Sequence, residues 1–324
     1  MKQSDYGIPR YYSIKTATAA LMSLLLIYLA FDILEIIGVV FWGWTLNIML
    51  SIWMRTMADI PIIVIALLCA RPQPALRVYR PGIKNFIYSL LLAFFAYIAL
   101  TVLINFLNYL MEGAGLTLPT EETNEVLFSQ PFWVQLLLLC VCAPFTEEIL
   151  FRGMLQNAYE RRYGWLAVLI AGLLFGWTHA EPLSVINGVM MGLLMGYVYI
   201  RTRSIWPPIA MHALFNLLAL TAIPDIYITN LPWSLGLFHQ QTATFADPGY
   251  TLYNFGMAGA AALMCLALIK LLKRNNPANV AQKAEYCPQQ RGELPLTIFT
   301  LCLLALRIVP VVLGYAISAY GVAL

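Results

Sequence analysis

Six polar residues whose side chains could do acid–base chemistry lie in otherwise apolar sequence. They are Glu147, Glu148 and Arg152 in CAPFTEEILFRG, His179 at the end of AGLLFGWTHA, and His212 and Asn216 in SIWPPIAMHALFN. Carboxylates and imidazoles exchange protons with water, and imidazole or amide N–H groups stabilise the oxyanion that forms on an attacked carbonyl. This set of groups is therefore suited to hydrolysis.

The spacing of the three charges separates their roles. Glu148 and Arg152 are four residues apart, so a helix places them on one face at ion-pair distance. Glu147 is offset by about 100° around the helix, which keeps its carboxylate available as a general base. Pro144 removes one backbone hydrogen bond just before them, and we expect it to kink the helix and admit water.

The histidines and the asparagine complete the candidate site. His179 could orient the water that Glu147 activates, while His212 and Asn216, again four residues apart, could donate hydrogen bonds to the oxyanion. The same carboxylate and imidazoles are also ordinary zinc ligands, although the H-E-x-x-H pattern of common zinc proteases is absent. Spacing alone leaves metal-free and zinc-assisted hydrolysis both open.

The elements that position these residues are long apolar segments. The chain of 324 residues is 61% hydrophobic and 11% charged, whereas soluble domains carry roughly 25% charged residues. Eighteen or more nearly uncharged residues suffice to cross a bilayer, and nine segments meet that criterion: 17–42, 47–70, 84–111, 131–157, 164–181, 183–200, 205–224, 250–272 and 295–320. We therefore predict an all-α, polytopic membrane helix bundle of about eight to nine transmembrane helices.

The distribution of charge indicates the topology. Lysine and arginine collect in short cytoplasmic loops, and sixteen of the 19 basic residues fall on one side of the predicted bundle: Lys2, Arg10, Lys15, Arg71, Arg77, Arg80, Lys84, Arg161, Arg162, Arg201, Arg203, Lys270, Lys273, Arg274, Lys283 and Arg291. This places the N-terminus in the cytoplasm and the C-terminus outside. The net charge of +3 then reflects topology, so the lipid bilayer is the expected partner and nucleic acid is not. The short loops favour a bacterial cytoplasmic membrane.

The interruptions between segments are too short for a soluble domain, so we expect one membrane-embedded unit. Its parts are N-terminal transmembrane helices over 1–130, core helices that carry the candidate site over 131–224, and C-terminal transmembrane helices over 225–324. Gly188, Gly192 and Gly196 recur every four residues, a spacing that lets a neighbouring helix approach closely.

The predicted spans place one residue at an unexpected depth. Counted from the cytoplasmic ends, Glu147 lies about ten residues deep, His212 about seven and His179 about fifteen. At 1.5 Å per residue, His179 would lie about 7 to 12 Å too far outward to meet the others. We expect either a tilted fifth helix or one that begins deeper than residue 164.

Residues 143–217 resemble the CPBP intramembrane proteases, also called the Abi family, which include the type II CaaX prenyl endopeptidases and bacteriocin-processing or self-immunity proteins. The resemblance rests on three motifs in order, EEILFR, FGWTH and HALFN, and on the intervening GLLMGYVYIRTRSIWPPIAMH. It covers about a quarter of the chain. The family is commonly labelled metalloprotease, but a metal-free glutamate mechanism is also argued for it.

The resemblance implies proteolysis within the membrane. It assigns water activation to Glu147, assistance to His179 and the oxyanion to His212 and Asn216, with Glu148 and Arg152 in support. The expected partner is a membrane-associated peptide or protein, prenylated or not.

Two other classes of function stay open. One is an ion or solute transporter, because Asp32, Glu35, Arg55, Asp59 and Arg307 also lie in predicted spans. The other is a noncatalytic membrane scaffold or bacteriocin-immunity protein.

Overall fold

The computed structural model of the chain describes residues 12–42, 59–61, 63–64, 68, 77–78, 80–116, 131–179, 181–222, 245–275 and 293–306. Apart from one short 3₁₀ turn, the regular structure in these ranges consists of α- and π-helices, which confirms the all-α prediction. Most of the predicted second span and the end of the ninth, from residue 307, lie outside the described residues.

The described helices follow the apolar segments in chain order. They are Ile14–Trp42 (α1), Ile83–Gly113 (α3), a continuous helix from Phe132 to Tyr163, Leu166–Trp177 (α8), Pro182–Thr202 (α9), Trp206–Ala222 (α10), Pro248–Asn275 (α11) and Glu293–Leu306 (α12). Five helical segments are long and apolar enough to cross a membrane: Ile14–Phe31, Ile83–Gly113, Phe132–Glu160, Pro182–Thr202 and Pro248–Asn275. The total of eight to nine spans stays a prediction.

The helix from Phe132 to Tyr163 changes its hydrogen bonding along its length. Phe132–Gln135 (α5), Ala143–Glu148 (α6) and Asn157–Tyr163 (α7) are α-helical, whereas Leu136–Cys142 (η2) and Ile149–Gln156 (η3) are π-helical. π-Helical turns are rare and occur frequently at functional sites. The two glutamates of the candidate site lie in the α-helical turn between the π-helical stretches.

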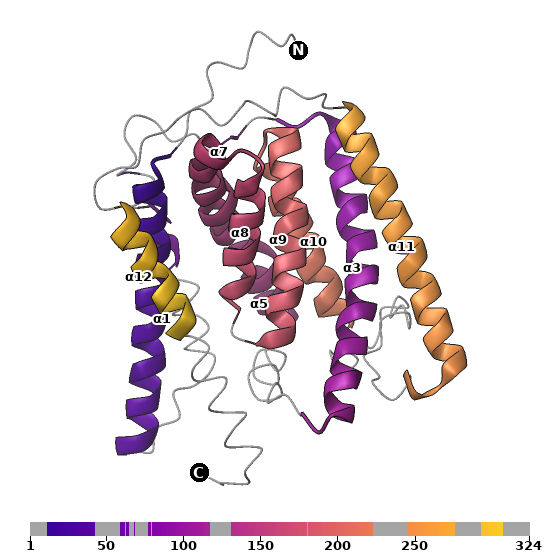
Figure 1. Cartoon of the computed structure of the whole chain (residues 1–324), viewed down its shortest axis with the longest axis horizontal. Coiled ribbons are helices and arrows are strands. Elements are labelled where there is room, and N and C mark those ends of the chain that lie inside the picture. Colours follow the sequence, from indigo (N-terminus) through magenta and orange to yellow (C-terminus); the bar gives the residue numbers. More distant parts are fainter. Residues whose placement is uncertain are drawn as a thin grey trace.

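The helices pack side by side in one bundle. Figure 1 shows α3 and α11 along one edge and α1 with α12 along the other, with α8, α9 and α10 between them. The contacts between helices agree with this arrangement, since α11 packs on α3, α3 on α10, α10 on α9, and α9 on α8. The helices that carry the candidate site therefore occupy the middle of the bundle.

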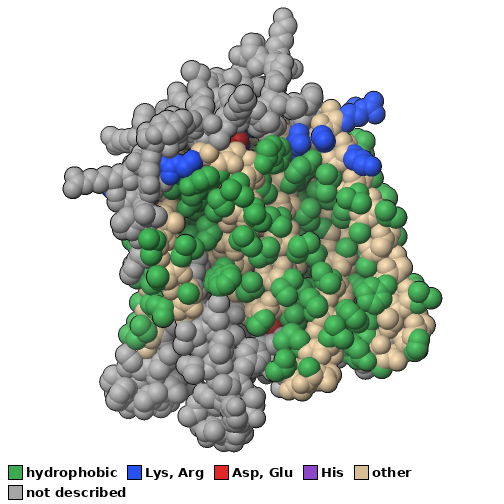
Figure 2. Space-filling model, viewed as in Figure 1, with side chains coloured by type: hydrophobic (Ala, Val, Ile, Leu, Met, Phe, Trp, Pro, Cys, Tyr) green, Lys and Arg blue, Asp and Glu red, His purple; other side chains and the backbone are tan. Residues whose placement is uncertain are grey.

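The face of the bundle seen in Figure 2 is largely apolar. Figure 2 shows hydrophobic side chains covering the visible face, with basic side chains gathered at the end where α11 terminates in Lys273 and Arg274. Exposed large hydrophobic residues such as Leu252 and Leu263 are 75% and 67% accessible. A surface of this kind suits contact with lipid tails and an interfacial layer of basic side chains.

Glycines allow α8 and α9 to approach closely, as the four-residue spacing predicted. A Cβ atom on Gly192 would lie 2.9 Å from the Cα atom of Gly172, and one on Gly188 would lie 2.9 Å from the Cα atom of Gly176. Two carbonyls of the same stripe accept hydrogen bonds from the long helix, Gly192 from Arg152 at 3.3 Å and Gly196 from Gln156 at 2.8 Å. The glycines of α9 thus allow close packing on α8, and their carbonyls also bind the helix from Phe132 to Tyr163.

The helix that carries Glu147 is longer than the predicted span 131–157. It continues past residue 157 to Tyr163 and ends before Gly164, whose φ angle is 56°. Glu160, near the end of this helix, is buried and pairs with Arg77 at 2.7 Å and Arg203 at 3.3 Å. The depth of the site residues in a bilayer, and the tilt or start expected of the fifth helix, stay predictions.

The close approach of α8 and α9 yields a stability prediction. A Cβ atom on Gly176 would lie 2.5 Å from the Val189 backbone nitrogen and 2.7 Å from the Val185 carbonyl oxygen, so Gly176→Ala must push the helices apart. We expect a loss of about 1–3 kcal/mol in the free energy of unfolding in detergent, typical of overpacking.

Gly259→Ala on α11 is the matched control, because no atom lies within 4 Å of the added Cβ. It should leave stability unchanged or raise it by up to about 1 kcal/mol through helix propensity. Equal effects of the two substitutions, measured by denaturant titration and circular dichroism, would contradict the packing described.

Candidate active site

The candidate site is built around the buried carboxylate of Glu148. Its side chain and that of Arg152 are both 0% exposed, and Arg152 Nη1 lies 2.9 Å from Glu148 Oε1. This is the ion pair that the four-residue spacing predicted. Arg152 Nη2 also donates to the Gly192 carbonyl at 3.3 Å, which ties the pair to α9.

Glu148 also fixes the imidazole of His212, an interaction that spacing did not reveal. His212 Nδ1 lies 3.0 Å from Glu148 Oε1, and His212 is buried on α10. A carboxylate paired with a guanidinium only accepts hydrogen bonds, so Nδ1 must carry the proton. The other ring nitrogen, Nε2, lies 3.9 Å from Glu147 Oε2.

Glu147 differs from Glu148 in exposure and in its partners. Its side chain is 30% exposed, and within the described part of the chain Oε2 has no hydrogen-bond partner. The 3.9 Å separation from His212 Nε2 is too long for a direct hydrogen bond. The Oε2 atom itself is buried, so a water that bridged it to His212 Nε2 would be held inside the bundle.

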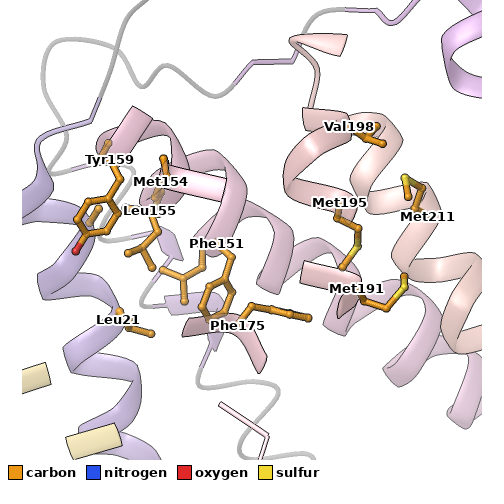
Figure 3. Close-up of a cluster of buried hydrophobic side chains, with 14 of the residues drawn as sticks. Leu21, Phe151, Met154, Leu155, Tyr159, Phe175, Met191, Met195, Val198 and Met211 are labelled. Atoms are coloured by element: carbon orange, nitrogen blue, oxygen red, sulfur yellow. The ribbon is translucent and has the colours of Figure 1, made fainter. Parts of the chain in front are cut away.

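Phe175 connects the two histidines. Its buried ring meets His179 edge-on at 5.3 Å between centroids and His212 at 5.7 Å, and the Arg152 guanidinium lies 4.4 Å from its centre. The ring also packs on Phe151 at 5.2 Å, and Figure 3 shows both phenyl rings within the buried cluster. The sequence marked Phe175 only by its position four residues before His179, and its central place was missed.

His179 lies two residues past the end of α8, whereas the prediction placed it near the end of a helical span over 164–181. Its Nδ1 is 3.1 Å from the Phe175 carbonyl oxygen, which can only accept, so the proton sits on Nδ1 and leaves Nε2 as an acceptor. His179 contacts the Phe175 ring, and its backbone N–H donates to the Gly176 carbonyl at 3.0 Å; no interaction described for it joins it to Glu147. Its role in orienting water stays a prediction.

Asn216 contacts the long helix at the point where a backbone donor is missing. Its Nδ2 donates to the Leu139 carbonyl at 2.7 Å. In the i→i+5 pattern of η2, that carbonyl would pair with the N–H of residue 144, which is a proline and has none. Asn216 thus replaces a lost backbone hydrogen bond, a role that the distance of five residues between Leu139 and Pro144 could have signalled.

A catalytic zinc ion generally takes three protein ligands. Among the described residues, no group of three or more His, Cys, Asp or Glu side chains lies close enough to hold one ion. Glu148, moreover, is already committed to Arg152 and His212. The described donor set does not fit a zinc site of this kind.

Comparison with known proteins covers the region that holds these residues. The family model described as type II CAAX prenyl endopeptidase Rce1-like matches residues 128–218. Residues 128–218 are therefore similar to that family. The resemblance drawn from the three motifs is therefore confirmed, and the Rce1-like region contains all six predicted site residues.

The relatives of this Rce1-like region are bacterial. "Putative membrane peptidase YdiL" of Bacillus subtilis (strain 168) is 31% identical over 32% of this chain and 43% of its own length. "Uncharacterized 24.3 kDa protein" of Escherichia coli is 32% identical over 31% of this chain and 51% of its own. "UPF0177 protein in abiGi 5'region" of Lactococcus lactis subsp. cremoris is 25% identical over 45% and 62%. The chain thus spans about half the length of the curated relatives it matches, and no solved structure shows a significant match.

The buried ion pair of the Rce1-like region predicts a large effect on stability. Arg152→Met leaves the Glu148 carboxylate buried beside His212 alone, and removing one partner of a buried pair costs about 3–5 kcal/mol. We expect that loss in the free energy of unfolding in detergent.

The double variant Glu148→Gln/Arg152→Met serves as the comparison, because it removes both buried charges. Its loss should be smaller than the sum of the two single losses, since neither charge is left unpaired. Additive losses would show that the two side chains do not stabilise each other.

Proposed function

We propose that this chain is an intramembrane endopeptidase that hydrolyses a peptide bond in a membrane-associated substrate, with Glu147 as the residue that activates water. One observation carries the proposal: a partly exposed carboxylate without a hydrogen-bond partner among the described residues lies 3.9 Å from a buried, fixed imidazole. This pairing of an available base with a second proton-handling group is what peptide hydrolysis needs. The similarity of residues 128–218 to the Rce1-like family supports it.

In the proposed reaction, water binds between Glu147 Oε2 and His212 Nε2. Glu147 takes a proton as the water oxygen attacks the scissile carbonyl, and the carbonyl oxygen becomes an oxyanion. When the intermediate collapses, Glu147 returns the proton to the leaving nitrogen, so the C–N bond breaks and an acid and an amine are released. His179, whose Nε2 is an acceptor, assists by holding the water.

Stabilisation of the oxyanion falls to His212 and Asn216. Because His212 Nδ1 already donates to Glu148, its Nε2 can donate only from the imidazolium form. In that form Glu147 and Glu148 together balance the charges of Arg152 and the imidazolium. Asn216 donates one N–H to the Leu139 carbonyl, and its second N–H is available to the oxyanion.

The setting of the site suggests the substrate. Helices long enough to span a membrane surround it, so the peptide must be brought to the bilayer by its own apolar segment or by a prenyl group. We propose eight to nine spans, an N-terminus on the basic, cytoplasmic side and a bacterial cytoplasmic membrane. Division into helices 1–130, 131–224 and 225–324 is part of the same proposal.

The rival functions rest on weaker observations. The transporter hypothesis rests on five charged residues in predicted spans. Of these, Arg55, Arg307 and the side chains of Asp32 and Glu35 lie outside the described residues. Asp59 is described and is buried. A noncatalytic scaffold would have no need of an exposed carboxylate beside His212, whereas a stable ion pair such as Glu148–Arg152 would suit it equally well.

The test is cleavage of a membrane-anchored peptide library by the purified protein in liposomes, followed by mass spectrometry. Glu147→Gln should lower kcat by about 10²–10⁴-fold, because it removes the general base. His212→Ala should lower kcat by about 10²–10³-fold through loss of an oxyanion donor.

Glu112→Gln is the matched control, since this exposed carboxylate accepts only from Asn108 at 2.8 Å, and its activity should equal that of the wild type. Wild-type cleavage that both site variants retain would end the protease assignment. Loss of activity with a chelator and recovery with zinc would instead contradict the metal-free steps.

A further inference from the structure

The end of the bundle where α9 and α11 terminate carries cationic and aromatic side chains that the proposed reaction does not use. Arg201 lies in the last turn of α9, and its guanidinium carbon is 4.9 Å from the centre of the Trp165 ring and 5.3 Å from that of Tyr197. The two rings lie 6.0 Å apart, with 30° between their planes. Trp165 is 38% exposed and Arg201 is partly exposed. The negative faces of the rings stabilise the cation at a position open to the surroundings.

A second cation reaches the same place from α11. The Tyr197 hydroxyl donates to the Ile269 carbonyl at 3.3 Å, which ties α9 to α11. Lys273 lies one turn beyond Ile269 on the same face of α11, and it is exposed. Within the described part of the chain, Lys273 forms no ion pair. The hydrogen bond therefore brings Arg201 and Lys273 to neighbouring positions on two helices.

The described acids do not balance the charge at this end. Figure 2 shows basic side chains gathered there. The acid described at this end, Glu160, is buried and already pairs with Arg77 and Arg203. Glu181 and Asp247 precede α9 and α11, so they lie at the opposite end of the bundle. The surface around Arg201 and Lys273 therefore attracts an anion.

An exposed apolar stripe begins beside these cations. It follows Trp165 along α8 at intervals of three or four residues, and its members are between 40% and 49% exposed: Leu166, Leu169, Leu173 and Trp177. Hydrocarbon chains pack on such a stripe, whereas an inorganic anion does not. The order of cation, aromatic ring and apolar stripe matches an amphiphile with a phosphate at one end.

We propose that Arg201, Lys273, Trp165 and Tyr197 form a binding site for the headgroup of an anionic phospholipid, whose acyl chains lie along the exposed face of α8. The guanidinium and the ammonium bind the phosphate, and the two rings hold Arg201 at the level of the headgroups. A zwitterionic lipid offsets its phosphate with its own cation, so the site selects lipids by net charge. None of the four residues belongs to the candidate active site, and the inference is independent of the protease function.

The test measures quenching of tryptophan fluorescence in liposomes that contain brominated phosphatidylglycerol or brominated phosphatidylcholine at equal mole fractions. In each protein, the signal of Trp165 is the part that Trp165→Phe removes. Phosphatidylglycerol should quench Trp165 of the wild type more strongly. Arg201→Gln and Lys273→Gln should each lower the ratio of the two lipid binding constants about fivefold, the contribution of one basic side chain near an anionic surface.

Lys15→Gln is the matched control. Lys15 is exposed and lies in the first turn of α1, which packs against α7 at the other edge of the bundle (Figure 1). Its replacement should leave the ratio unchanged. Equal quenching of Trp165 by the two lipids would overturn the inference. So would a ratio that both site variants retain, or one that Lys15→Gln lowers as much as they do, since net charge alone would then explain the preference.

Inorganic phosphate separates a lipid from a free anion. Added phosphate should leave the quenching by phosphatidylglycerol unchanged, because the ion has no chains to pack on α8. Displacement of the lipid by phosphate would assign the two cations to a free anion and overturn the proposal. Circular dichroism checks that each variant is folded. Because Lys273 is exposed, Lys273→Gln disturbs no packing and decides the test alone if Arg201→Gln does not fold.

Discussion

The bundle depends on one buried carboxylate that must satisfy two cationic partners from different helices. Glu148 is fully buried, so its charge is tolerable only if Arg152 and His212 both reach it, at 2.9 and 3.0 Å. This requirement brings α10 against α6. Arg152 also donates to the Gly192 carbonyl at 3.3 Å, and a Cβ atom on Gly192 would lie 3.2 Å from the Phe175 ring over which the Arg152 guanidinium sits. The glycine stripe and the ion pair are therefore parts of one constraint.

Two adjacent glutamates acquire different properties from the helix that carries them. Glu148 is fully buried and paired with Arg152 and His212, whereas the side chain of Glu147 is 30% exposed. The π-helical stretches on either side shift the side chains relative to a regular α-helix. Pro144 lies just before the pair, and the bond from Asn216 to Leu139 compensates for its missing donor. The same amide thus stabilises the irregular backbone and links α10 to it.

The spacing of residues predicted contacts within one helix and between adjacent helices. It did not predict contacts between residues far apart in the sequence. The Glu148–Arg152 pair followed from four-residue spacing, and the close helix packing followed from Gly188 and Gly192. The bond between Glu148 and His212 joins residues 64 positions apart, so no local pattern encodes it. The fourth helix also extends beyond its predicted end at residue 157, where Arg77 and Arg203 from distant segments neutralise the buried charge of Glu160.

The helices outside residues 128–218 do more than add membrane-spanning segments. They also constrain the geometry of the candidate site. α10 packs against α3, where the Tyr97 ring meets Phe215 edge-on at 5.0 Å, one residue before Asn216 and three after His212. An aromatic contact at that position limits rotation of α10, and rotation is the motion that would separate His212 from Glu148. The region shared with the Rce1-like family supplies the polar groups, but their mutual distances depend on surfaces that the family match does not include.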